Sequence, residues 1–393
     1  MSAQTIEIPV KPAVLKWARE SAGKTAEDVA TRLRLSLDTV HRWESGEQAP
    51  CLMHLRELCG FLKRPLAVFF LPAAPQEPPP PGDFRRLPED KAHPFSMKTI
   101  LAIRRARMMQ SAARDFVQDT GMHPTLPIGS ATLADTPATL AHSLRQTIGI
   151  TIKAQNAWAG NDGAFLAWKT ALEARGLLIA ELAFPLKEAR AFSVMDTRAP
   201  LIVLNSTDSF TGKTFSLFHE YAHILLGRSG VLDNSPNVRL TDEGRLSEQF
   251  CNAFAAEFLV PIQEFANAKV NREHRVSAPW TDQEIDQLAR HFHVSPHVIV
   301  GRLLTLGKMS EAAYGRKSDE YDKKYQEWTE QKRFGKRVPA KLCLRENGRP
   351  FVALVYDAFD NKRITYKDIA DCLGTKTKYV DSVARLLKNS VAA

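Results

Sequence analysis

The sequence predicts a mainly α-helical protein of several domains with one small α+β core, and three observations support this fold class. The chain has 393 residues, which is too long for one ordinary hydrophobic core, so we expect about two to four domains. Hydrophobic residues make up 44% and charged residues 25%, as in globular proteins. Segments with helical periodicity recur along the chain, and only residues 177–205 are rich in short strand-like runs.

The N-terminal region has two short helical patterns around a turn, in LKWARESAGKTAEDVATRLRLSLDTVHRWESGEQAP. Thr25 and Asp28 have the spacing of a capping box at the start of one helix, and Ser36 is placed to cap the next. The apolar positions expected to bury the junction are Val29, Leu33, Leu35, Val40 and Trp43. This pattern resembles the phage-repressor type of helix-turn-helix, the XRE family, and the resemblance continues to about Pro72.

The resemblance to XRE proteins implies that the helix from Ser36 to Glu44 enters the major groove of DNA. The side chains expected to face the duplex are Ser36, Leu37, Asp38, Thr39, His41 and Arg42. Two departures from the family weaken this expectation: Ala26 stands where a glutamine is common, and Asp38 brings negative charge toward the phosphates. Basic side chains that offset this charge are Lys24, Arg34, His41 and Arg42, so we expect weak DNA binding or binding as a homodimer. A helical module that binds a protein partner is the alternative.

A proline-rich stretch, AAPQEPPPPGDF, separates the N-terminal module from the rest of the chain. Its consecutive prolines, Pro78 to Pro81, cannot continue a helix or a central strand and favour an extended spacer. The expected organisation is a helix-turn-helix domain at 1–72, a Pro-rich linker at 73–95, a helical connector at 96–162, an α+β domain at 163–307 and a basic helical C-terminal domain at 308–393.

The elements that follow the linker are predicted from periodicity and end signals. Helices are expected over 96–120, with Gly121 at the end, and over 137–148 and 163–175. The apolar runs LLIAEL, FSVMD and LIVLN, separated by proline and charged turns, predict the strands of a small sheet. Two more helices follow: one contains FHEYAH and ends at Gly227, and one covers LSEQFCNAFAAEFLVP and stops at Pro261.

The segment FHEYAH contains an HExxH motif within an otherwise apolar helix. Residues i and i+4 share one face of a helix, so His219 and His223 point the same way with Glu220 beside them. Two histidines at this spacing bind zinc, and the glutamate acts as the general base. A sheet followed by such a helix is the architecture of small zincins, so the predicted core is zincin-like.

A catalytic zinc site needs a third protein ligand and one open position. The next helix offers Glu248 and Glu257. Glu248 has Asn252 one turn later, where an amide could hold a ligand histidine. Glu257 is nearer the end of its helix, where capping or solvation is the simpler role. The spacing favours Glu248 and leaves Glu257 open.

The run RLSEQFCNAFAAEFLVP, with LIVLNSTDS and FHEYAHILL ahead of it, resembles the ImmA/IrrE family of zinc-dependent peptidases over roughly residues 165–305. In that family the glutamate of Glu-x-x-Ala/Cys-Asn-x-Phe-Ala-Ala is the third ligand. The resemblance implies that His219, His223 and Glu248 bind Zn²⁺ and that Glu220 is the general base of peptide hydrolysis. Tyr221 departs from the aliphatic residue that is commoner at its position, and we expect its ring to fill space.

The order of a repressor-type head, a Pro-rich spacer, a helical middle and a zinc domain resembles fused regulator-peptidases related to ImmA/IrrE proteins. This resemblance implies a DNA-binding transcriptional regulator with a zinc endopeptidase domain, whose protein substrate is a transcriptional repressor in a stress, phage or mobile-element circuit. The alternatives are a non-proteolytic sensor-regulator and a toxin–antitoxin component whose zinc domain senses a signal or binds a partner. Zinc held only for folding would use the same ligands.

The C-terminal third has two more segments of helix-turn-helix character, residues 284–307 and 364–387. The first contains three histidines that straddle its turn, so we expect packed or solvated rings rather than ligands: His291, His293 and His297. The second is expected to place Lys376 and Lys378 on its second helix and to contact DNA or serve as a docking module. Between them, residues 317–341 predict one charged helix with an aromatic stripe.

Charge is distributed unevenly along the chain. The net charge of +9 divides into +5 over residues 1–115, −3 over 116–315 and +7 over 316–393. Basic ends attract phosphate backbones, although simple solubilisation explains them equally well. No apolar run approaches the roughly 18 residues that cross a bilayer, and no signal peptide is recognisable, so we expect a cytoplasmic protein without a membrane partner. The five cysteines lack CxxC spacing, which favours reduced thiols.

Overall fold

The computed structural model describes residues 6–76, 95–120, 124–227, 242–275, 278–331 and 338–389. The chain divides into two compact units: residues 1–79 with 92–103, and residues 80–91 with 104–393. The division falls within one helix, α5 (Met97–Thr120). Most of the expected proline-rich linker and Gly121 lie outside the described residues.

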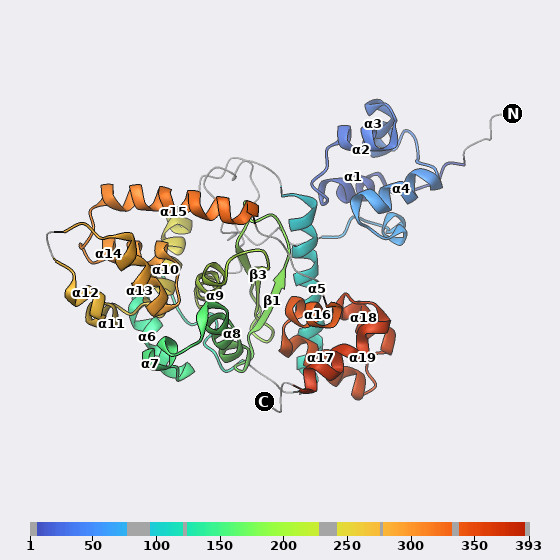
Figure 1. The fold of residues 1–393 in the computed structure, drawn as a ribbon. Helices are drawn as coiled ribbons and strands as arrows, with labels where there is room; N and C mark the ends of the chain where they lie inside the picture. The colour runs from blue at the N-terminus through green and yellow to red at the C-terminus, as the bar shows by residue number, and fades with distance from the viewer. Residues whose placement is uncertain are drawn as a thin grey trace. The chain divides into compact units, whose positions relative to one another are not determined.

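The first unit is a set of short helices around one core (Figure 1). Its elements are α1 (Pro12–Glu20), α2 (Ala26–Leu33), α3 (Leu37–Ser45), α4 (Leu52–Leu62) and the 3-10 turn η1 (Leu66–Phe70). The apolar positions predicted to join α2 and α3 lie within this core or against it, which confirms that part of the pattern.

Local caps set the turn between α2 and α3. The backbone N–H of Asp28 donates to Thr25 Oγ1, and the N–H of Thr25 donates to Asp28 Oδ2, both at 3.1 Å, which is the predicted capping box. Helix α2 ends at Arg34 in the left-handed conformation, with φ of 56°. Ser36 Oγ then accepts the N–H of Thr39 at 3.2 Å and starts α3. These bonds satisfy backbone groups that helix ends leave without partners.

The second unit contains a three-stranded sheet at the three predicted apolar runs. The strands are β1 (Leu178–Leu182), β2 (Ala191–Val194) and β3 (Leu201–Asn205). Their order is β1-β3-β2, with β1 parallel and β2 antiparallel to β3. Helices α8 (Gly160–Glu173) and α9 (Phe210–Leu225) pack against this sheet (Figure 1). Both β1 and β3 are buried along their whole length, which explains why their runs are apolar rather than alternating.

Helix α9 also packs against α10 (Asp242–Leu259), which in turn contacts α6 (Pro137–Ile148). Aromatic rings fix these contacts. Trp168 of α8 meets Phe218 of α9 edge to face, with ring centroids 5.2 Å apart, and Phe218 stacks on Phe258 of α10 at 3.9 Å. A short helix that the sequence did not predict, α7 (Ile152–Asn156), lies between α6 and α8 in the chain.

The helices after α10 are α11 (Ile262–Asn267), α12 (Lys269–Glu273), α13 (Asp282–Phe292), α14 (Pro296–Thr305) and α15 (Glu311–Gln331). The helix predicted over 317–341 is confirmed up to Gln331, but its bounds are wrong, because α15 starts at Glu311 and Pro339 begins another helix after an extended Val338. Proline suits the first turn of a helix because that position needs no N–H donor. The helix predicted over 163–175 is α8, which starts at Gly160.

The C-terminal module, residues 338–389, consists of α16 (Pro339–Asn347), α17 (Arg349–Asp360), α18 (Tyr366–Leu373), the 3-10 turn η3 (Thr377–Tyr379) and α19 (Val380–Asn389). It docks on β1 through Gly348, whose φ is 72° and where a Cβ would lie 2.4 Å from the carbonyl oxygen of Ile179, so only glycine fits. The prediction that Lys376 and Lys378 lie on the second helix is wrong, because Lys376 precedes η3 and Lys378 lies in it. Among the described helices, none is long and apolar enough to cross a membrane.

Candidate metal centre and helix-turn-helix head

Helix α9 places the HExxH motif in the core. Ser209 caps the helix by accepting the N–H of Gly212 at 3.0 Å, and Gly227, with φ of 65°, follows its end. The exposed fraction of His219, Glu220 and His223 is 0% in each case. Because the two histidines are one turn apart, both rings leave the same face of α9.

Glu248 of α10 meets both imidazoles. The Nε2 atoms of His219 and His223 are 3.2 Å apart. The carboxylate of Glu248 places Oε2 3.5 Å from His219 Nε2 and Oε1 3.4 Å from His223 Nε2. In the part of the chain that the structure describes, this is the one group of His, Cys, Asp and Glu side chains that could hold a metal ion. The structure therefore brings together the three residues that the sequence suggested as ligands.

The spacings within this group fit a single tetrahedral zinc ion. With metal–ligand distances of about 2.0–2.1 Å, the nitrogen and oxygen ligands of zinc lie roughly 3.3 Å from one another. The two imidazole nitrogens are 3.2 Å apart, and each lies 3.4–3.5 Å from a different oxygen of the Glu248 carboxylate, close to that value. With one ligand atom taken from each residue, the three atoms lie within 4.8 Å of one another. Two imidazoles and one carboxylate are also a donor set of catalytic zinc, which leaves a fourth position open.

Neighbouring side chains orient the two histidines. The Nδ1–H of His219 donates to Asn252 Oδ1 at 3.1 Å, which directs Nε2 of that ring toward Glu248. Cys251, the residue before Asn252, is buried, and its proximity raises the pKa of His223. A hydrogen bond such as the one to Asn252 fixes the tautomer and the orientation of a ligand ring. The sequence pointed to Asn252 by its spacing, and Cys251 stands at the Ala/Cys position of the motif quoted for the resemblance.

Glu220 is held from the sheet. Ser193 of β2 donates from Oγ to Glu220 Oε2 at 2.9 Å, and both side chains are buried. The sequence missed Ser193 because it lies 27 residues before Glu220 and no spacing rule links a strand to the helix that follows. The strand β2 thus contributes directly to the site.

The surroundings of the group shift the pKa values of Glu248 and His223. Burial alone would raise the pKa of Glu248, but hydrogen bonds from His219 and His223 lower it well below its usual range. Burial alone would lower the pKa of His223, but Cys251 and Glu248 raise it above its ordinary value. The side chain of Glu248 is 28% exposed while both histidines are fully buried, so the group is reached from the side of Glu248.

Glu257, the ligand candidate that the spacing left open, has other partners. Its Oε1 accepts the N–H of Ile262 at 3.0 Å at the start of α11, and its other oxygen pairs with Arg302 of α14. It therefore caps one helix and holds another. Tyr221 fills space as expected, because its side chain is 0% exposed and its hydroxyl donates to the carbonyl of Pro127 at 3.0 Å.

The three histidines around the α13–α14 turn have separate surroundings. His291 bonds to Asn156 at 2.9 Å, His297 bonds to Ser318 at 2.7 Å, and His293 is buried. His291 is exposed and His297 is half-buried, so the rings are packed or solvated separately, and within the described residues they do not form a group with metal-ligand spacing.

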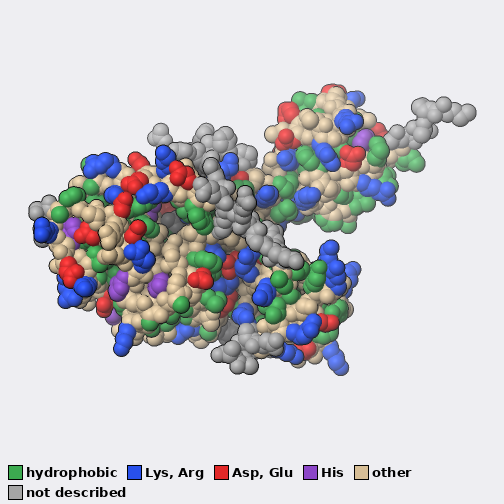
Figure 2. Space-filling view, in the orientation of Figure 1, with side chains coloured by type: hydrophobic (Ala, Val, Ile, Leu, Met, Phe, Trp, Pro, Cys, Tyr) green, Lys and Arg blue, Asp and Glu red, His purple; other side chains and the backbone are tan. Residues whose placement is uncertain are grey.

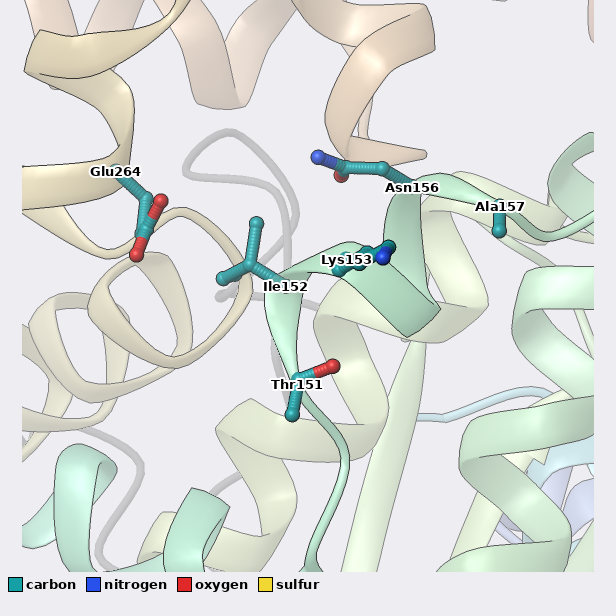
Figure 3. Close-up of a pocket in the computed structure, with 6 residues that line it drawn as sticks. All are labelled: Thr151, Ile152, Lys153, Asn156, Ala157 and Glu264. Atoms are coloured by element: carbon teal, nitrogen blue, oxygen red, sulfur yellow. The ribbon is translucent and has the colours of Figure 1, made fainter.

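An open pocket of about 640 Å³ lies elsewhere, between α7 and α11 (Figure 3). Figure 3 shows Glu264 facing Ile152 across it, with Lys153 and Asn156 on the same short helix. None of the predicted site residues lines this pocket, so it provides no part of the candidate metal centre.

In the first unit, the polar residues predicted to face DNA lie on the outer side of α3, but the same prediction is wrong for Leu37, which packs against the core. Ser36, Asp38, His41 and Arg42 are exposed, and Thr39 is partly exposed. Asp38 forms an ion pair with Arg42 one turn later, at 3.0 Å. The negative charge of Asp38 is thus partly neutralised within the helix itself.

Two family models match the chain, and no curated protein does. Residues 13–68 match a model described as a helix-turn-helix domain, which covers α1 to η1. Residues 172–304 match the peptidase M78 model described as an IrrE N-terminal-like domain, which covers the sheet, α9 and α10. The chain therefore carries a helix-turn-helix domain at its N-terminus and an IrrE-like peptidase domain at 172–304, which confirms both resemblances seen in the sequence.

Proposed function

We propose that the protein is a DNA-binding transcriptional regulator whose IrrE-like domain is a zinc-dependent endopeptidase. One observation carries this proposal: His219, His223 and Glu248, from two helices, bring two imidazole nitrogens and a carboxylate to within metal-binding distance of one another, with a buried glutamate beside them.

His219, His223 and Glu248 would hold the zinc ion. Zinc bound in such a site supplies Lewis acidity toward a water molecule and a peptide carbonyl. Asn252 keeps the ring of His219 directed at the ion, so its role is to position a ligand.

Glu220 acts as the general base of hydrolysis. Its carboxylate accepts the proton of the attacking water and then passes it to the leaving amine. Ser193 orients this carboxylate through its hydrogen bond to Oε2. Because Glu220 is fully buried, bulk water does not compete for that hydrogen bond.

The N-terminal head contacts DNA through the outer side of α3. Its helix-turn-helix domain presents Ser36, His41 and Arg42 to solvent where such domains read the major groove. One chain with both activities would bring the peptidase to proteins bound near its own site on DNA, at a raised effective concentration. A transcriptional repressor in a stress, phage or mobile-element circuit is therefore the substrate class that we infer.

Metal analysis of the full chain tests the zinc site. The wild type should hold close to one zinc per chain, and His219→Ala and Glu248→Ala should each lose it. His291→Ala is the control, because His291 binds Asn156 away from the site. Zinc retained by both site variants would refute the assignment.

Glu220→Gln separates hydrolysis from metal binding. It should keep zinc and slow repressor cleavage by about 10²–10⁴-fold, the usual contribution of a general base. If the cellular phenotype survives this change, the zinc domain is a sensor and not a peptidase.

A further inference from the structure

The C-terminal module repeats the construction of the helix-turn-helix head. Thr365 and Asp368 form a capping box at the start of α18, as Thr25 and Asp28 do at the start of α2. Both first helices have 8 residues, and both end in a left-handed residue, Gly374 with φ of 61° and Arg34 with φ of 56°. Because the two turns share their length, cap and handedness, we expect the element after each turn to leave its first helix at the same angle.

The correspondence continues through the turn. The N–H of Thr375 donates to Ala370 O at 2.9 Å, as the N–H of Leu35 donates to Ala30 O at 2.9 Å. Buried positions follow at the same spacing in both segments, and the matched pairs are Val29 and Ile369, Val40 and Val380, and Trp43 and Val383. One constant offset of 340 residues therefore relates the two segments from the first cap to the second helix.

The exposed side of this second copy is more basic at its leading end. Lys376 and Lys378 are exposed at the positions that Ser36 and Asp38 occupy in the head. Within the described residues neither lysine forms an ion pair, whereas Asp38 pairs with Arg42. The module as a whole has ten Lys and Arg residues against six Asp and Glu, and Figure 2 shows blue side chains over it at the lower right.

A third copy of this turn shows that the turn alone does not make a DNA-binding surface. Between α13 and α14, the N–H of Val294 donates to Ala289 O at 3.0 Å after a left-handed His293. There α15 packs on α14, and His297 bonds to Ser318 of α15. The side of α14 that would enter a groove is thereby covered, while the corresponding side of η3 and α19 is exposed.

We propose that the C-terminal module is a second DNA-binding site, which binds duplex DNA through η3 and the start of α19. Lys376 and Lys378 contact backbone phosphates, and the exposed side of α19 lies in the major groove. Duplex DNA fits this surface because it combines helix-turn-helix geometry with unpaired positive charge. This proposal does not depend on peptidase activity.

Lysine footprinting of the full-length wild type tests the site without any substitution. Acetylation is measured by mass spectrometry with and without a short duplex of mixed sequence at low salt. DNA should protect Lys376 and Lys378 and leave Lys153, an exposed lysine of α7, equally reactive. Equal reactivity of all three lysines with saturating DNA would overturn the proposal.

The double variant Lys376→Gln, Lys378→Gln then measures the contribution to binding. The slope of log Kd against log salt should fall by about 2, because each phosphate contact contributes roughly 0.9 to it. Lys153→Gln should leave the slope unchanged. A double variant that is folded by circular dichroism and has the wild-type slope would refute the phosphate contacts.

Discussion

Two of the buried ionic clusters in the described part of the second unit differ in how completely their members pair with one another. The closed cluster consists of Lys169, Glu181 and Lys213, and the open cluster consists of His219, His223 and Glu248. In the closed cluster each carboxylate oxygen of Glu181 has its own ammonium group, at 2.9 Å in both cases. In the open cluster the donor atoms are 3.2–3.5 Å apart and converge on one point.

The closed cluster has no capacity left for a ligand. Burial alone would raise the pKa of Glu181, but Lys169 and Lys213 lower it, so the carboxylate stays charged inside the fold. Lys213 also lies 4.6 Å from the ring centroid of Phe165 and 4.4 Å from that of Phe210. Buried charge is tolerated here because every charged atom has a partner.

The difference shows what distinguishes a structural cluster from a candidate site. Charged groups that pair with one another stabilise the fold and exclude ligands. Imidazole and carboxylate donor atoms gathered 3.2–3.5 Å apart have the separations of ligands around one shared cation. The four predictions below test this distinction, beginning with the largest expected effect.

Glu181→Ala should destabilise the fold strongly, because it leaves Lys169 and Lys213 buried without a counter-ion. We expect the free energy of unfolding, measured by urea denaturation, to fall by about 3–5 kcal/mol. Glu273→Ala is the control, since the side chain of Glu273 is 66% exposed, and should change stability by less than about 0.5 kcal/mol. If the free energy of unfolding falls no more than in the control, Glu181 does not serve as the buried counter-ion of the two lysines.

Glu173, beside the closed cluster, should make stability depend on pH. Burial raises its pKa from 4.5 to about 7. The folded state therefore binds the proton of Glu173 more tightly than the unfolded state does. This proton contributes fully to the free energy of unfolding below pH 4.5, and the contribution is lost as pH rises to about 7. The loss is about 3 kcal/mol, at roughly 1.4 kcal/mol for each pKa unit.

Urea denaturation at several pH values between 4.5 and 8 measures this dependence. Glu173→Gln should flatten the decline, because the amide does not titrate. A variant whose stability falls with pH as steeply as that of the wild type would exclude Glu173 as the source.

Asn252→Ala should lower the zinc affinity of the open cluster and leave the protein folded. Loss of the bond to His219 frees that ring to rotate, and zinc affinity should fall about 10–100-fold, as measured by competition with a chromophoric chelator. Asn156→Ala is a matched control, because it removes an amide–imidazole bond to His291 away from the cluster. Equal zinc affinity in the two variants would argue against a positioning role for Asn252.

Ser193→Ala should have the smallest effect. It removes one buried hydrogen bond to Glu220, so the free energy of unfolding should fall by about 1 kcal/mol while zinc affinity stays near that of the wild type. A large loss of zinc would show that Ser193 supports the ligands and not only the general base.

Much of the candidate site could be predicted because its parts are local. Helical spacing places His219 and His223 on one face, and Asn252 lies one turn after Glu248 on another helix. The capping box at Thr25 was predicted from the same kind of short-range rule. The end of the helix predicted over 317–341 was wrong, because periodicity alone gave no sign of the extended Val338 before Pro339.

The sequence by itself determined the elements, their caps and the residue types on each helix face, because these depend on neighbours within about one helical turn. Only the tertiary structure decided which distant side chains meet. It pairs Glu257 with Arg302, so Glu257 is not a metal ligand, and it places Ser193 within hydrogen-bond distance of Glu220. It also pairs two lysines with the buried glutamate of the apolar run LLIAEL. It also covers α14 with α15 and leaves one side of α19 exposed to solvent. The sequence pattern of a single helix does not determine which other helix packs against it, so these two outcomes could not be predicted.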